Sequence, residues 1–385
     1  MSDERVSTLD PFRVVHVLRA PKGGAFRHVC DLVTGQAERG LEVGIVSSTG
    51  FDEVATEAAF AELTDVCALG IHTVPMQRTL GWSDLSAVRG LGKICRQVGA
   101  DVMHGHGAKG AAYVRLLAPA IGSKAVYTPH GGSLHFSWRS PAGVVYLTLE
   151  RLLKSRTDGI LFESDYACRT YEDKIGAVSC AQRVVYNGLH DEEFTPVQEG
   201  APEYDFVFVG EIRRLKGIFV LLEAMARLRS AGMPSLLMVG SGPDEAELRA
   251  RIDALGLGDA VTLSPPIYPA RDAFALGRCV VTPSLAESLP YIVLEVLASR
   301  VPLLTTRVGG IPEIFGPHSD VLLPPGDAGA LADAMSELIS DPGSAEARAL
   351  KLHTHVKLHL RTSQMVDAVV DFYREVLGSY SRDDG

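Results

Sequence analysis

The sequence predicts an α/β protein with two doubly wound parallel-sheet domains. Apolar runs of strand length alternate with segments of helical periodicity, and this alternation restarts near residue 204. A polar, proline-containing segment at residues 195–202 separates the two series. Strands that alternate with helices favour a parallel sheet covered on both faces. A chain of 385 residues is long enough for two such domains, each with its own core.

The first series opens with a buried strand at residues 12–18. Gly23 and Gly24 follow that strand and begin an amphipathic helix that ends at Gly40. We expect the first domain to span residues 1–190. Its further strands are expected at residues 41–48, 71–76, 101–106, 124–129, 159–163 and 183–186, and its further helices at residues 85–98 and 109–121.

The second series has the same alternation and is expected to form a domain at residues 203–362. The tail at residues 345–377 also has a helical pattern. The strands of this domain are expected at residues 206–210, 235–240, 261–264, 279–283, 302–306 and 320–323. Its clearest helices are expected at residues 216–231, 244–255 and 328–340.

Composition limits the classes of function. The net charge of −10 argues against a nucleic-acid partner. The 6 cysteines lack C-x-x-C spacing, which favours reduced thiols over disulfides or a zinc site. Residues 1–10 are polar and acidic and show no secretory signal, and no apolar run approaches the ~20 residues that cross a bilayer. These features predict a cytoplasmic protein.

Two carboxylates with seven residues between them, Glu287 and Glu295, are the most informative pair. Glu287 follows an apolar strand pattern and is expected near a strand-to-helix turn, where unpaired backbone N–H groups attract anions. Glu295 lies about 12 Å further along by helical rise. That separation suits one carboxylate on a sugar hydroxyl and the other on a ribose, with a diphosphate across the helix start. The alternative is that both are exposed glutamates on a helix. The apolar residues between them argue against it, and so does the Gly-Gly-x-Pro-Glu segment at residues 309–313.

The E-x7-E element and the downstream Gly-Gly-x-Pro-Glu resemble retaining nucleotide-sugar glycosyltransferases of family 4, which have the GT-B architecture. The resemblance covers nearly the whole chain. It implies two Rossmann-like domains that face a cleft, with the acceptor on the N-terminal domain and the donor on the C-terminal one. It also implies that a helix at about residues 363–378 packs back on the N-terminal domain.

A basic turn follows the first strand of the second series, which ends at Gly210. Lys216 matches a family lysine on the donor diphosphate, whereas Glu211 stands where the family has an arginine. We favour Arg213 over Arg214 as the replacement for that arginine, because charge develops on the leaving phosphate. A solvated basic turn is the alternative.

Glycines and prolines end the next two strands. Gly240 and Gly242 would let the chain approach a nucleotide closely, although a lone G-x-G is commonly only a turn. The family has a Gly-x-Gly at the corresponding position, which favours the nucleotide-binding interpretation. By the same resemblance, Pro266 and Ile267 belong to the segment that contacts the base.

Three motifs of the first series also end strands. Gly23 and Gly24 resemble a family loop that closes over the donor phosphates, where a helix start supplies free N–H groups. His130 matches the histidine that faces the donor sugar, although a single histidine is more often structural. His104 and His106 have no cysteine or carboxylate at ligand spacing, so they predict no metal site, and His106 is expected to line the acceptor side.

The resemblance implies a metal-independent hexosyltransferase that works with retention. Its donor would be a UDP- or GDP-linked sugar, and its acceptor a growing cell-surface polysaccharide or a lipid-linked saccharide. No cofactor is expected, and no D-x-D motif occurs. Glu287 would hold sugar hydroxyls and Glu295 the ribose, while Ser288, Leu289 and Pro290 surround the sugar-phosphate.

Two other functions stay open at this point. A nucleotide-sugar 2-epimerase of GT-B type needs carboxylates that abstract a proton, and the motifs fit a transferase better. A non-catalytic nucleotide-sugar-binding protein is kept open by Glu211.

Residues 136–156 combine aromatic side chains with an apolar stretch and four basic residues, Arg139, Arg151, Lys154 and Arg156. Such a segment suits an anionic membrane surface, which would place the protein at the inner face of the cytoplasmic membrane. A helix that packs its apolar face on the sheet, with its charges in water, is the alternative.

Overall fold

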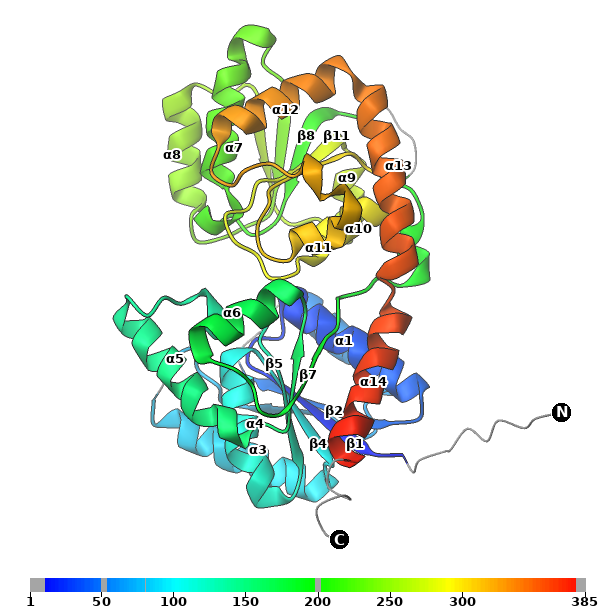
Figure 1. Ribbon diagram of the computed structural model, residues 1–385. Coiled ribbons are helices and arrows are strands. Elements are labelled where there is room, and N and C mark those ends of the chain that lie inside the picture. The colour runs from blue at the N-terminus through cyan, green and yellow to red at the C-terminus, as the bar shows by residue number, and fades with distance from the viewer. Residues whose placement is uncertain (1–10, 50–53, 80, 198–201, 379–385) are drawn as a thin grey trace, which may run out of the picture. The chain divides into compact units, whose positions relative to one another are not determined.

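The computed structural model describes residues 11–49, 54–79, 81–197 and 202–378 (Figure 1). The described chain forms two compact units. Unit 1 takes its residues from 1–163, 167–185 and 365–385, and unit 2 from 164–166 and 186–364. Each unit is built around one parallel sheet, which confirms the predicted fold class.

Unit 1 has a 7-stranded parallel sheet in the order β3-β2-β1-β4-β5-β6-β7. The order reverses at β1, so the edge of the sheet beside β1 and β4 is the switch point where ligands of such folds bind. The strands are β1 (Arg13–Leu18), β2 (Glu42–Ser48), β3 (Ile71–Val74), β4 (Val102–His106), β5 (Lys124–Thr128), β6 (Gly159–Phe162) and β7 (Ala181–Val184).

Helices cover both faces of that sheet because its strands are apolar on both faces. Val14 packs in one core with α1 and α14, whereas the next residue, Val15, packs in another core with α3 and α4. The helices are α1 (Gly23–Glu38), α2 (Val54–Leu63), α3 (Ser83–Val98), α4 (Gly107–Ile121), α5 (Pro141–Leu153), α6 (Asp165–Ile175) and α14 (Thr362–Gly378), with 3₁₀ turns η1 (Gly132–His135) and η2 (Lys154–Arg156).

The helix α14 completes the core of unit 1 although it lies at the end of the chain. Val366, Phe372 and Tyr373 are buried against the sheet. The contact is close: a Cβ on Gly159 of β6 would lie 2.7 Å from the Phe372 ring. The core of unit 1 therefore combines β1 and α1 with α14, which are far apart in the sequence.

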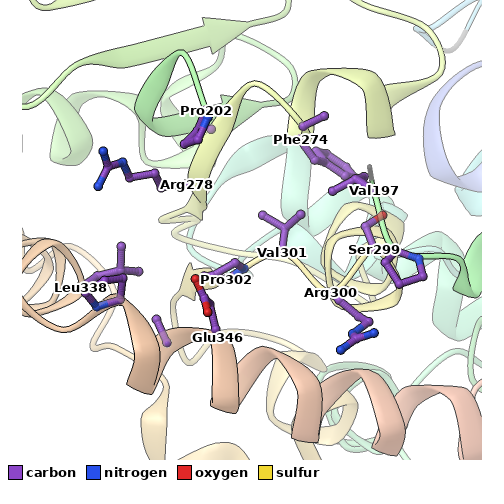
Figure 2. A pocket seen from close by; sticks show the side chains of 15 residues that line it. Val197, Pro202, Phe274, Arg278, Ser299, Arg300, Val301, Pro302, Leu338 and Glu346 are labelled. Atoms are coloured by element: carbon purple, nitrogen blue, oxygen red, sulfur yellow. The ribbon is translucent and has the colours of Figure 1, made fainter. Parts of the chain in front are cut away.

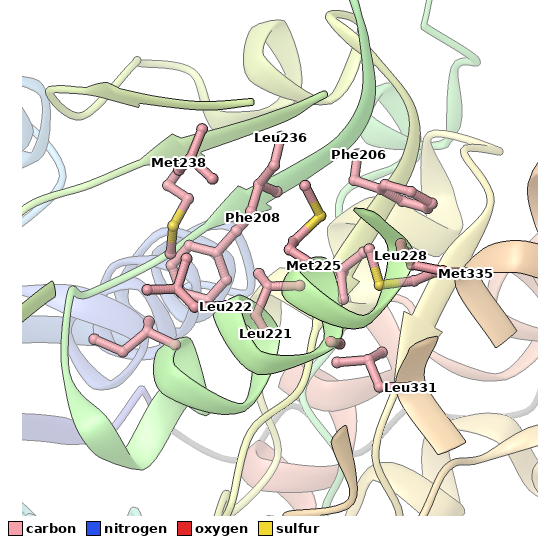
Figure 3. Close-up of a cluster of buried hydrophobic side chains, with 14 of the residues drawn as sticks. Phe206, Phe208, Leu221, Leu222, Met225, Leu228, Leu236, Met238, Leu331 and Met335 are labelled. Atoms are coloured by element: carbon pink, nitrogen blue, oxygen red, sulfur yellow. The ribbon is translucent and has the colours of Figure 1, made fainter. Parts of the chain in front are cut away.

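Unit 2 has a 5-stranded parallel sheet in the order β10-β9-β8-β11-β12. Phe206 and Phe208 of β8 pack with α7, α8 and α12 (Figure 3), while Val207 faces α9 on the other side. The strands are β8 (Tyr204–Val209), β9 (Leu236–Val239), β10 (Val261–Ser264), β11 (Gly277–Thr282) and β12 (Leu303–Thr305). The helices are α7 (Ile218–Arg227), α8 (Glu245–Leu255), α9 (Ala270–Phe274), α10 (Tyr291–Ala298), α11 (Ile311–Phe315), α12 (Ala328–Ser340) and α13 (Pro342–His359), and the 3₁₀ turns are η3 (Asp191–Phe194), η4 (Arg214–Lys216), η5 (Leu228–Ala231) and η6 (Gly316–Val321).

One predicted strand is wrong. The strand expected at residues 320–323 is the end of η6 followed by a single bridge between Leu323 and Thr306. The tail with the helical pattern forms two helices, α13 and α14, and Arg361 between them pairs with Leu189. Leu189 N–H donates to Leu360 O over 3.0 Å, and Thr362 N–H donates to Leu189 O over 2.9 Å. Backbone pairing to a distant segment outweighed the local helical pattern.

Candidate functional site

An ion pair lies at the carboxyl edge of the unit 2 sheet. Lys216, at the end of η4, holds Glu287 with Nζ 2.6 Å from Oε1. Ser284 Oγ donates to the same oxygen over 2.7 Å. The lysine side chain is 28% exposed and the glutamate side chain 11%. The pair is therefore oriented by the protein and still reachable from solvent.

Glycines allow the loops that carry this pair to touch. Gly217 has φ of +74°, and a Cβ there would lie 1.8 Å from Pro283 O. Gly309 has φ of +57°, and a Cβ there would lie 2.1 Å from Glu287 O. Both positions need a residue without a side chain. The turn after β8, the loop after β11 and the segment after β12 are thereby packed into one edge.

The two arginines of the turn after β8 have different surroundings. Arg214 pairs with Glu247 and stacks on Phe219, its guanidinium carbon 4.6 Å from the ring centre. Arg213 is 48% exposed, and its closest acidic group is Glu211, with Nη1 3.8 Å from Oε2. Arg213 is the more available cation.

A pocket of about 220 Å³ opens beside the ends of β9 and β10. Gly240 and Pro266 line it, together with Ser241, Ser264 and Pro265. Gly240 is packed against β8, since a Cβ would lie 1.9 Å from Gly210 O, and Gly242 similarly approaches Ile212 O. Ile267 packs on the core beside Val207 instead of lining the pocket.

The region between Glu287 and Glu295 is only partly helical. The helix α10 begins at Tyr291, with Pro290 as its N-cap, so the expected helical rise applies only to the second half of the segment. Leu289 is 4% exposed and packs in the core, while its carbonyl accepts from Asn187 Nδ2 over 3.0 Å. Ser288 O accepts from Gly310 N over 2.7 Å. Glu295 is half-buried on α10.

A larger pocket, of about 510 Å³, lies at the opposite edge of the same sheet (Figure 2). Its lining includes Pro202, Gly277 and Pro302, which come at or just before the starts of β8, β11 and β12. Ligands of parallel α/β sheets bind beyond the carboxyl ends of the strands. No predicted site residue lines this pocket.

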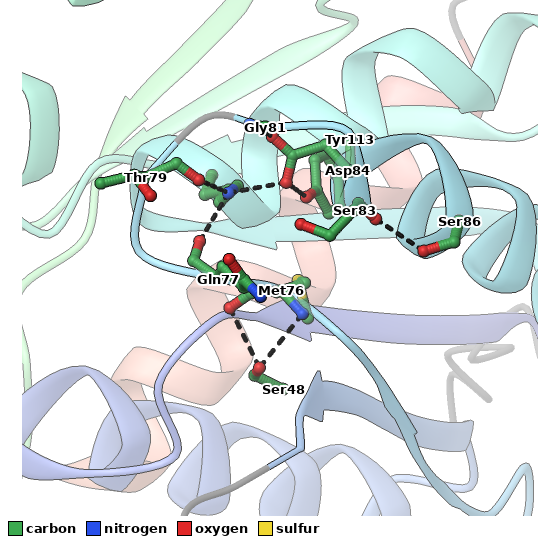
Figure 4. Close-up of polar contacts among 10 residues, drawn as sticks. Ser48, Met76, Gln77, Thr79, Gly81, Ser83, Asp84, Ser86 and Tyr113 are labelled. Carbon is green, nitrogen blue, oxygen red and sulfur yellow. Dashed lines mark hydrogen bonds and ion pairs between the residues drawn. The ribbon is translucent and has the colours of Figure 1, made fainter.

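In unit 1, Gly23 and Gly24 form the exposed start of α1, where Gly23 has φ of +68°. Nearby at the same edge, Lys109 holds the loop after β3: Nζ lies 2.7 Å from Asp84 Oδ1 and 2.8 Å from Thr79 O (Figure 4). Tyr113 OH donates to Asp84 as well. These contacts tie Thr79 and Asp84 to Lys109 of α4.

His130 lies two residues after the end of β5 and has a left-handed backbone conformation. Its φ is +48°, and Gly131 and Gly132 have positive φ as well. A non-glycine residue with positive φ is uncommon, although histidine is one of the residue types enriched there. Its ring is 7% exposed, and Nδ1 donates to Glu163 Oε1 over 2.6 Å.

The other ring nitrogen of His130 belongs to a row of buried imidazoles. His130 Nε2 lies 2.9 Å from His106 Nδ1, His106 Nε2 lies 3.0 Å from His16 Nδ1, and His16 Nε2 lies 2.9 Å from Gln36 Oε1. We call Gln36, His16, His106, His130 and Glu163 the imidazole chain. Its members come from α1, β1, β4 and the ends of β5 and β6.

Burial keeps the inner imidazoles uncharged. It lowers the pKa of His16 to about 4, against a hydrogen bond to Gln36 that raises it. Burial and the neighbouring histidines hold the pKa of His104 and His106 well below the usual value. His104 is bonded on both sides, with Nδ1 2.6 Å from Tyr373 OH and Nε2 2.8 Å from Thr128 Oγ1.

The histidines also form two groups whose ring nitrogens lie within 4.8 Å of one another. One is His16, His104 and His106, and the other is His28, His106 and His130. The sequence motif at residues 104–106 was expected to hold no metal, and spacing along the chain gave no sign of His16, His28 or Glu163. The register of β1 and β4 supplies the missing link, since it pairs His16 with His104.

Two family descriptions match this chain. Residues 203–341 match "Glycosyl transferases group 1", and residues 22–193 match "Glycosyltransferase Family 4". Together they cover every strand of the two sheets except β1. The chain belongs to the group 1 glycosyltransferases of GT-B architecture.

Solved structures of low sequence identity share the fold of this glycosyltransferase chain. Sucrose-phosphate synthase from Thermosynechococcus elongatus superposes with a TM-score of 0.81 at 20% identity, over 96% of this chain and 100% of that one. Anabaena Alr3699/HepE in complex with UDP and glucose gives a TM-score of 0.79 at 16% identity, over 94% of this chain and 100% of that one.

A curated relative matches part of the glycosyltransferase chain more strongly. The putative teichuronic acid biosynthesis glycosyltransferase TuaC of Bacillus subtilis is 38% identical over 130 residues, which are 34% of this chain and 31% of that protein. Matches to the first curated relatives span between 31% and 51% of those proteins. Among the described residues, none of the helices has the length and apolar character needed to cross a membrane.

Proposed function

We propose that this protein is a retaining glycosyltransferase that moves a hexose from a nucleotide-diphosphate sugar to a hydroxyl acceptor. The observation that carries the proposal is the oriented Lys216–Glu287 pair at the carboxyl edge of unit 2. A cation beside a carboxylate suits a ligand that carries a diphosphate next to a sugar. Support comes from HepE, a structural neighbour in complex with UDP and glucose. The donor is proposed to be a UDP- or GDP-linked sugar bound at this edge.

Each side chain at that edge has a role in this proposal. Lys216 and Arg213 stabilise the negative charge that develops on the leaving diphosphate. Glu287 accepts hydrogen bonds from sugar hydroxyls, and Glu295 accepts from the ribose. The pocket beside Gly240 and Pro266 takes the base. The chemistry needs no metal in this proposal, because the lysine, the arginine and backbone N–H groups supply the positive charge.

In unit 1, the start of α1 at Gly23 and Gly24 is proposed to approach the donor phosphates. Free N–H groups and the helix dipole favour an anion there. His130, which follows β5, is proposed to face the donor sugar. The acceptor is proposed to be a growing cell-surface polysaccharide or a lipid-linked saccharide, in line with the teichuronic acid pathway named for TuaC.

The first experiment identifies the donor and then tests the pair. A thermal-shift panel of UDP- and GDP-sugars finds the donor, since a bound ligand raises the apparent stability. With that donor, Glu287→Gln and Lys216→Ala are expected to lower kcat/KM for transfer by about 10²-fold or more. The matched controls are Glu223→Gln and Arg251→Ala, which remove one member of an exposed ion pair in the same unit. Turnover of both site variants at the level of the controls contradicts the proposal.

One observation favours a second candidate, a protein that binds nucleotide sugars without transferring them. Glu211 stands at the expected arginine position, 51% exposed and 3.8 Å from Arg213. A carboxylate there weakens the field on a diphosphate. Calorimetry that shows donor binding, with no transfer to a panel of acceptors and no interconversion of the donor alone, supports this candidate over the transferase and over a 2-epimerase.

We also propose that unit 1 contacts a membrane surface through α5. Val144, Val145 and Leu152 are exposed on this helix, next to the basic residues 151, 154 and 156. Arg151 stacks on Trp138, with 4.3 Å between the guanidinium carbon and the ring centre. Sedimentation with vesicles that contain anionic lipid is expected to pull down the wild type and less of a Leu152→Glu variant. Equal recovery of both contradicts this contact.

A further inference from the structure

One serine ties together the ends of three neighbouring strands of unit 1. Ser48 ends β2, which lies between β1 and β3 in the sheet. Its N–H donates over 3.3 Å to the carbonyl oxygen of Arg19, the residue directly after β1. Its hydroxyl donates to Met76 O over 3.0 Å, and Met76 N–H donates back to Ser48 Oγ over 3.1 Å (Figure 4). The segments after β1 and β3 therefore meet at the carboxyl edge of the sheet, next to the switch point at β1.

The segment after β3 is also held to α4, on both sides of Arg78. Lys109 Nζ donates to the carbonyl oxygens of Gln77 and Thr79, which are the two neighbours of that arginine (Figure 4). Arg78 itself is exposed. The backbone at Arg78 is therefore fastened to the helix, while the residue stays open to solvent.

The same lysine anchors the turn that carries Trp82. Lys109 Nζ pairs with Asp84 Oδ1 over 2.7 Å, and the other oxygen of Asp84 accepts from Gly81 N over 3.1 Å. Asp84 N–H in turn donates to Gly81 O over 3.0 Å. Trp82 lies inside this closed turn and is 89% exposed. Tryptophan is typical of binding surfaces, because its rigid ring offers a large apolar face and loses little conformational entropy on contact.

Two guanidinium groups share this edge without a counter-charge. Arg19 is half-buried and Arg78 is exposed, and neither side chain forms an ion pair or a hydrogen bond with any residue in the described part of the chain. Burial lowers the pKa of Arg19, the positive charge of Arg78 lowers it further, and Tyr146 on α5 opposes both. Like charges repel more strongly where water is partly excluded. An anion bound by both arginines would relieve that repulsion.

An exposed indole beside two arginines favours one chemical class of ligand. A guanidinium binds a carboxylate or a phosphate through two parallel N–H bonds. The C–H face of a pyranose ring packs on an aromatic ring while the sugar hydroxyls stay in water. A neutral sugar would leave the arginines without a counter-charge, and a simple anion would leave the indole bare. A saccharide that carries a carboxylate or a phosphate satisfies both.

We propose that this edge of unit 1 is a subsite for an anionic saccharide, with Arg19 and Arg78 on its carboxylate or phosphate and Trp82 against its sugar ring. Unit 1 is the domain expected to hold the acceptor. The proposal therefore names the chemical class of the acceptor, and in that respect it rests on the proposed function. The binding of the anionic saccharide does not depend on that function.

The chain has two tryptophans, so NMR of the indole N–H groups in the full chain tests the subsite without any turnover. Trp138 is the internal control, because its Nε1 donates to Lys174 O over 3.0 Å and Arg151 stacks on its ring. Glucuronic acid and glucose 6-phosphate at millimolar concentrations are expected to move the Trp82 signal and to leave that of Trp138 in place. Glucose and inorganic phosphate at the same concentrations are expected to move the Trp82 signal less, because each lacks one half of the ligand. The stronger of the two anionic sugars shows whether the substituent is a carboxylate or a phosphate.

Substitutions at the subsite are expected to weaken the two anionic sugars. Arg78→Gln is expected to lower their affinity by about tenfold in calorimetry, because it removes a charge-assisted pair of hydrogen bonds. The matched control is Arg89→Gln, which removes an exposed arginine of α3 and is expected to bind like the wild type. Trp82→Ala is expected to lower the affinity as well, and Trp82→Phe to restore part of the loss, because it keeps an aromatic face.

Three results overturn the proposal. They are a Trp82 signal that neither anionic sugar moves, a Trp82 signal that glucose or inorganic phosphate moves just as far, or equal affinities in Arg78→Gln and Arg89→Gln.

A transfer assay separates the subsite from the proposed function. With an anionic acceptor, Arg78→Gln is expected to raise the KM for the acceptor by about tenfold with little change in kcat. Anionic sugars that bind at Trp82 without any transfer refute the proposed function and leave the subsite standing. Transfer with a wild-type KM in Arg78→Gln, together with an unmoved Trp82 signal, refutes the subsite and leaves the function standing.

Discussion

The ion pairs of this chain differ mainly in how deeply their side chains are buried. Arg115 and Glu150 form an ion pair inside unit 1, with Nη1 2.8 Å from Oε2 and both side chains nearly inaccessible. Tyr127 OH and Ser133 Oγ donate to the other carboxylate oxygen over 3.0 and 2.7 Å. Arg115, Tyr127 and Ser133 all lose their acceptor if the Glu150 carboxylate is removed.

Glu150→Ala is therefore expected to lower the free energy of unfolding by about 3–5 kcal/mol, because it leaves a buried guanidinium without a counter-charge. Glu42→Ala is the matched control. It breaks an Arg13 pair of 2.7 Å whose side chains are 47% and 42% exposed, and it is expected to cost at most about 1 kcal/mol. Urea denaturation of both variants checks this, and equal losses would contradict the burial argument.

The residue scale is also where prediction from sequence succeeded least. Lys216 and Glu287 were predicted from their motifs, and Lys216 Nζ lies 2.6 Å from Glu287 Oε1. Glu163 carried no motif, because its contact with His130 depends on which strands are neighbours in the folded sheet. The neighbouring positions of β5 and β6 bring Glu163 to His130, and no local pattern encodes that order.

At the scale of elements, the short turn η4 depends on one glycine. Gly217 ends η4 with φ of +74°, and a Cβ there would meet Pro283 O at 1.8 Å. Gly217→Ala is expected to destabilise unit 2 by about 1–3 kcal/mol and to move Lys216 away from Glu287. The variant is therefore expected to bind nucleotide sugars more weakly as well.

Gly258→Ala is the control, since a Cβ there meets nothing within 4 Å. Thermal unfolding and a thermal-shift titration with the donor separate the two effects. A Gly217→Ala protein as stable as the Gly258→Ala protein would show that the turn tolerates a side chain.

The strands were predictable because they are apolar on both faces, and that composition is local. β1 illustrates this, since Val14 and Val15 are both buried, on opposite faces. The segment at residues 320–323 is short and apolar enough for a strand but pairs at Leu323 alone. The break at residues 360–361 depends on Leu189, about 170 residues earlier, so no local pattern predicts it.

At the scale of the whole molecule, buried neutral histidines make stability depend on pH. The folded pKa of His16 is about 4, below its unfolded value of 6.5. The unfolded chain therefore binds the proton first, and the stabilisation is present above pH 6.5 and is lost as the pH falls toward 4.

The free energy of unfolding is expected to fall by about 2 kcal/mol between pH 7.5 and pH 5 through His16 alone. Urea denaturation at the two pH values measures the change, and His16→Gln, which is uncharged at both, is expected to show a smaller one. The same slope in the two proteins would mean that His16 is not the group responsible.

The assignment of roles to Lys216 and Glu287 is tested most directly by calorimetry with two ligands, the nucleoside diphosphate and the matching nucleotide sugar. Lys216→Ala is expected to weaken the binding of both by about tenfold or more, because both carry the diphosphate. Glu287→Gln is expected to weaken the nucleotide sugar about tenfold while leaving the nucleoside diphosphate within about twofold of wild type. Equal losses for both ligands in Glu287→Gln, or wild-type affinities in both variants, would contradict the account of this site.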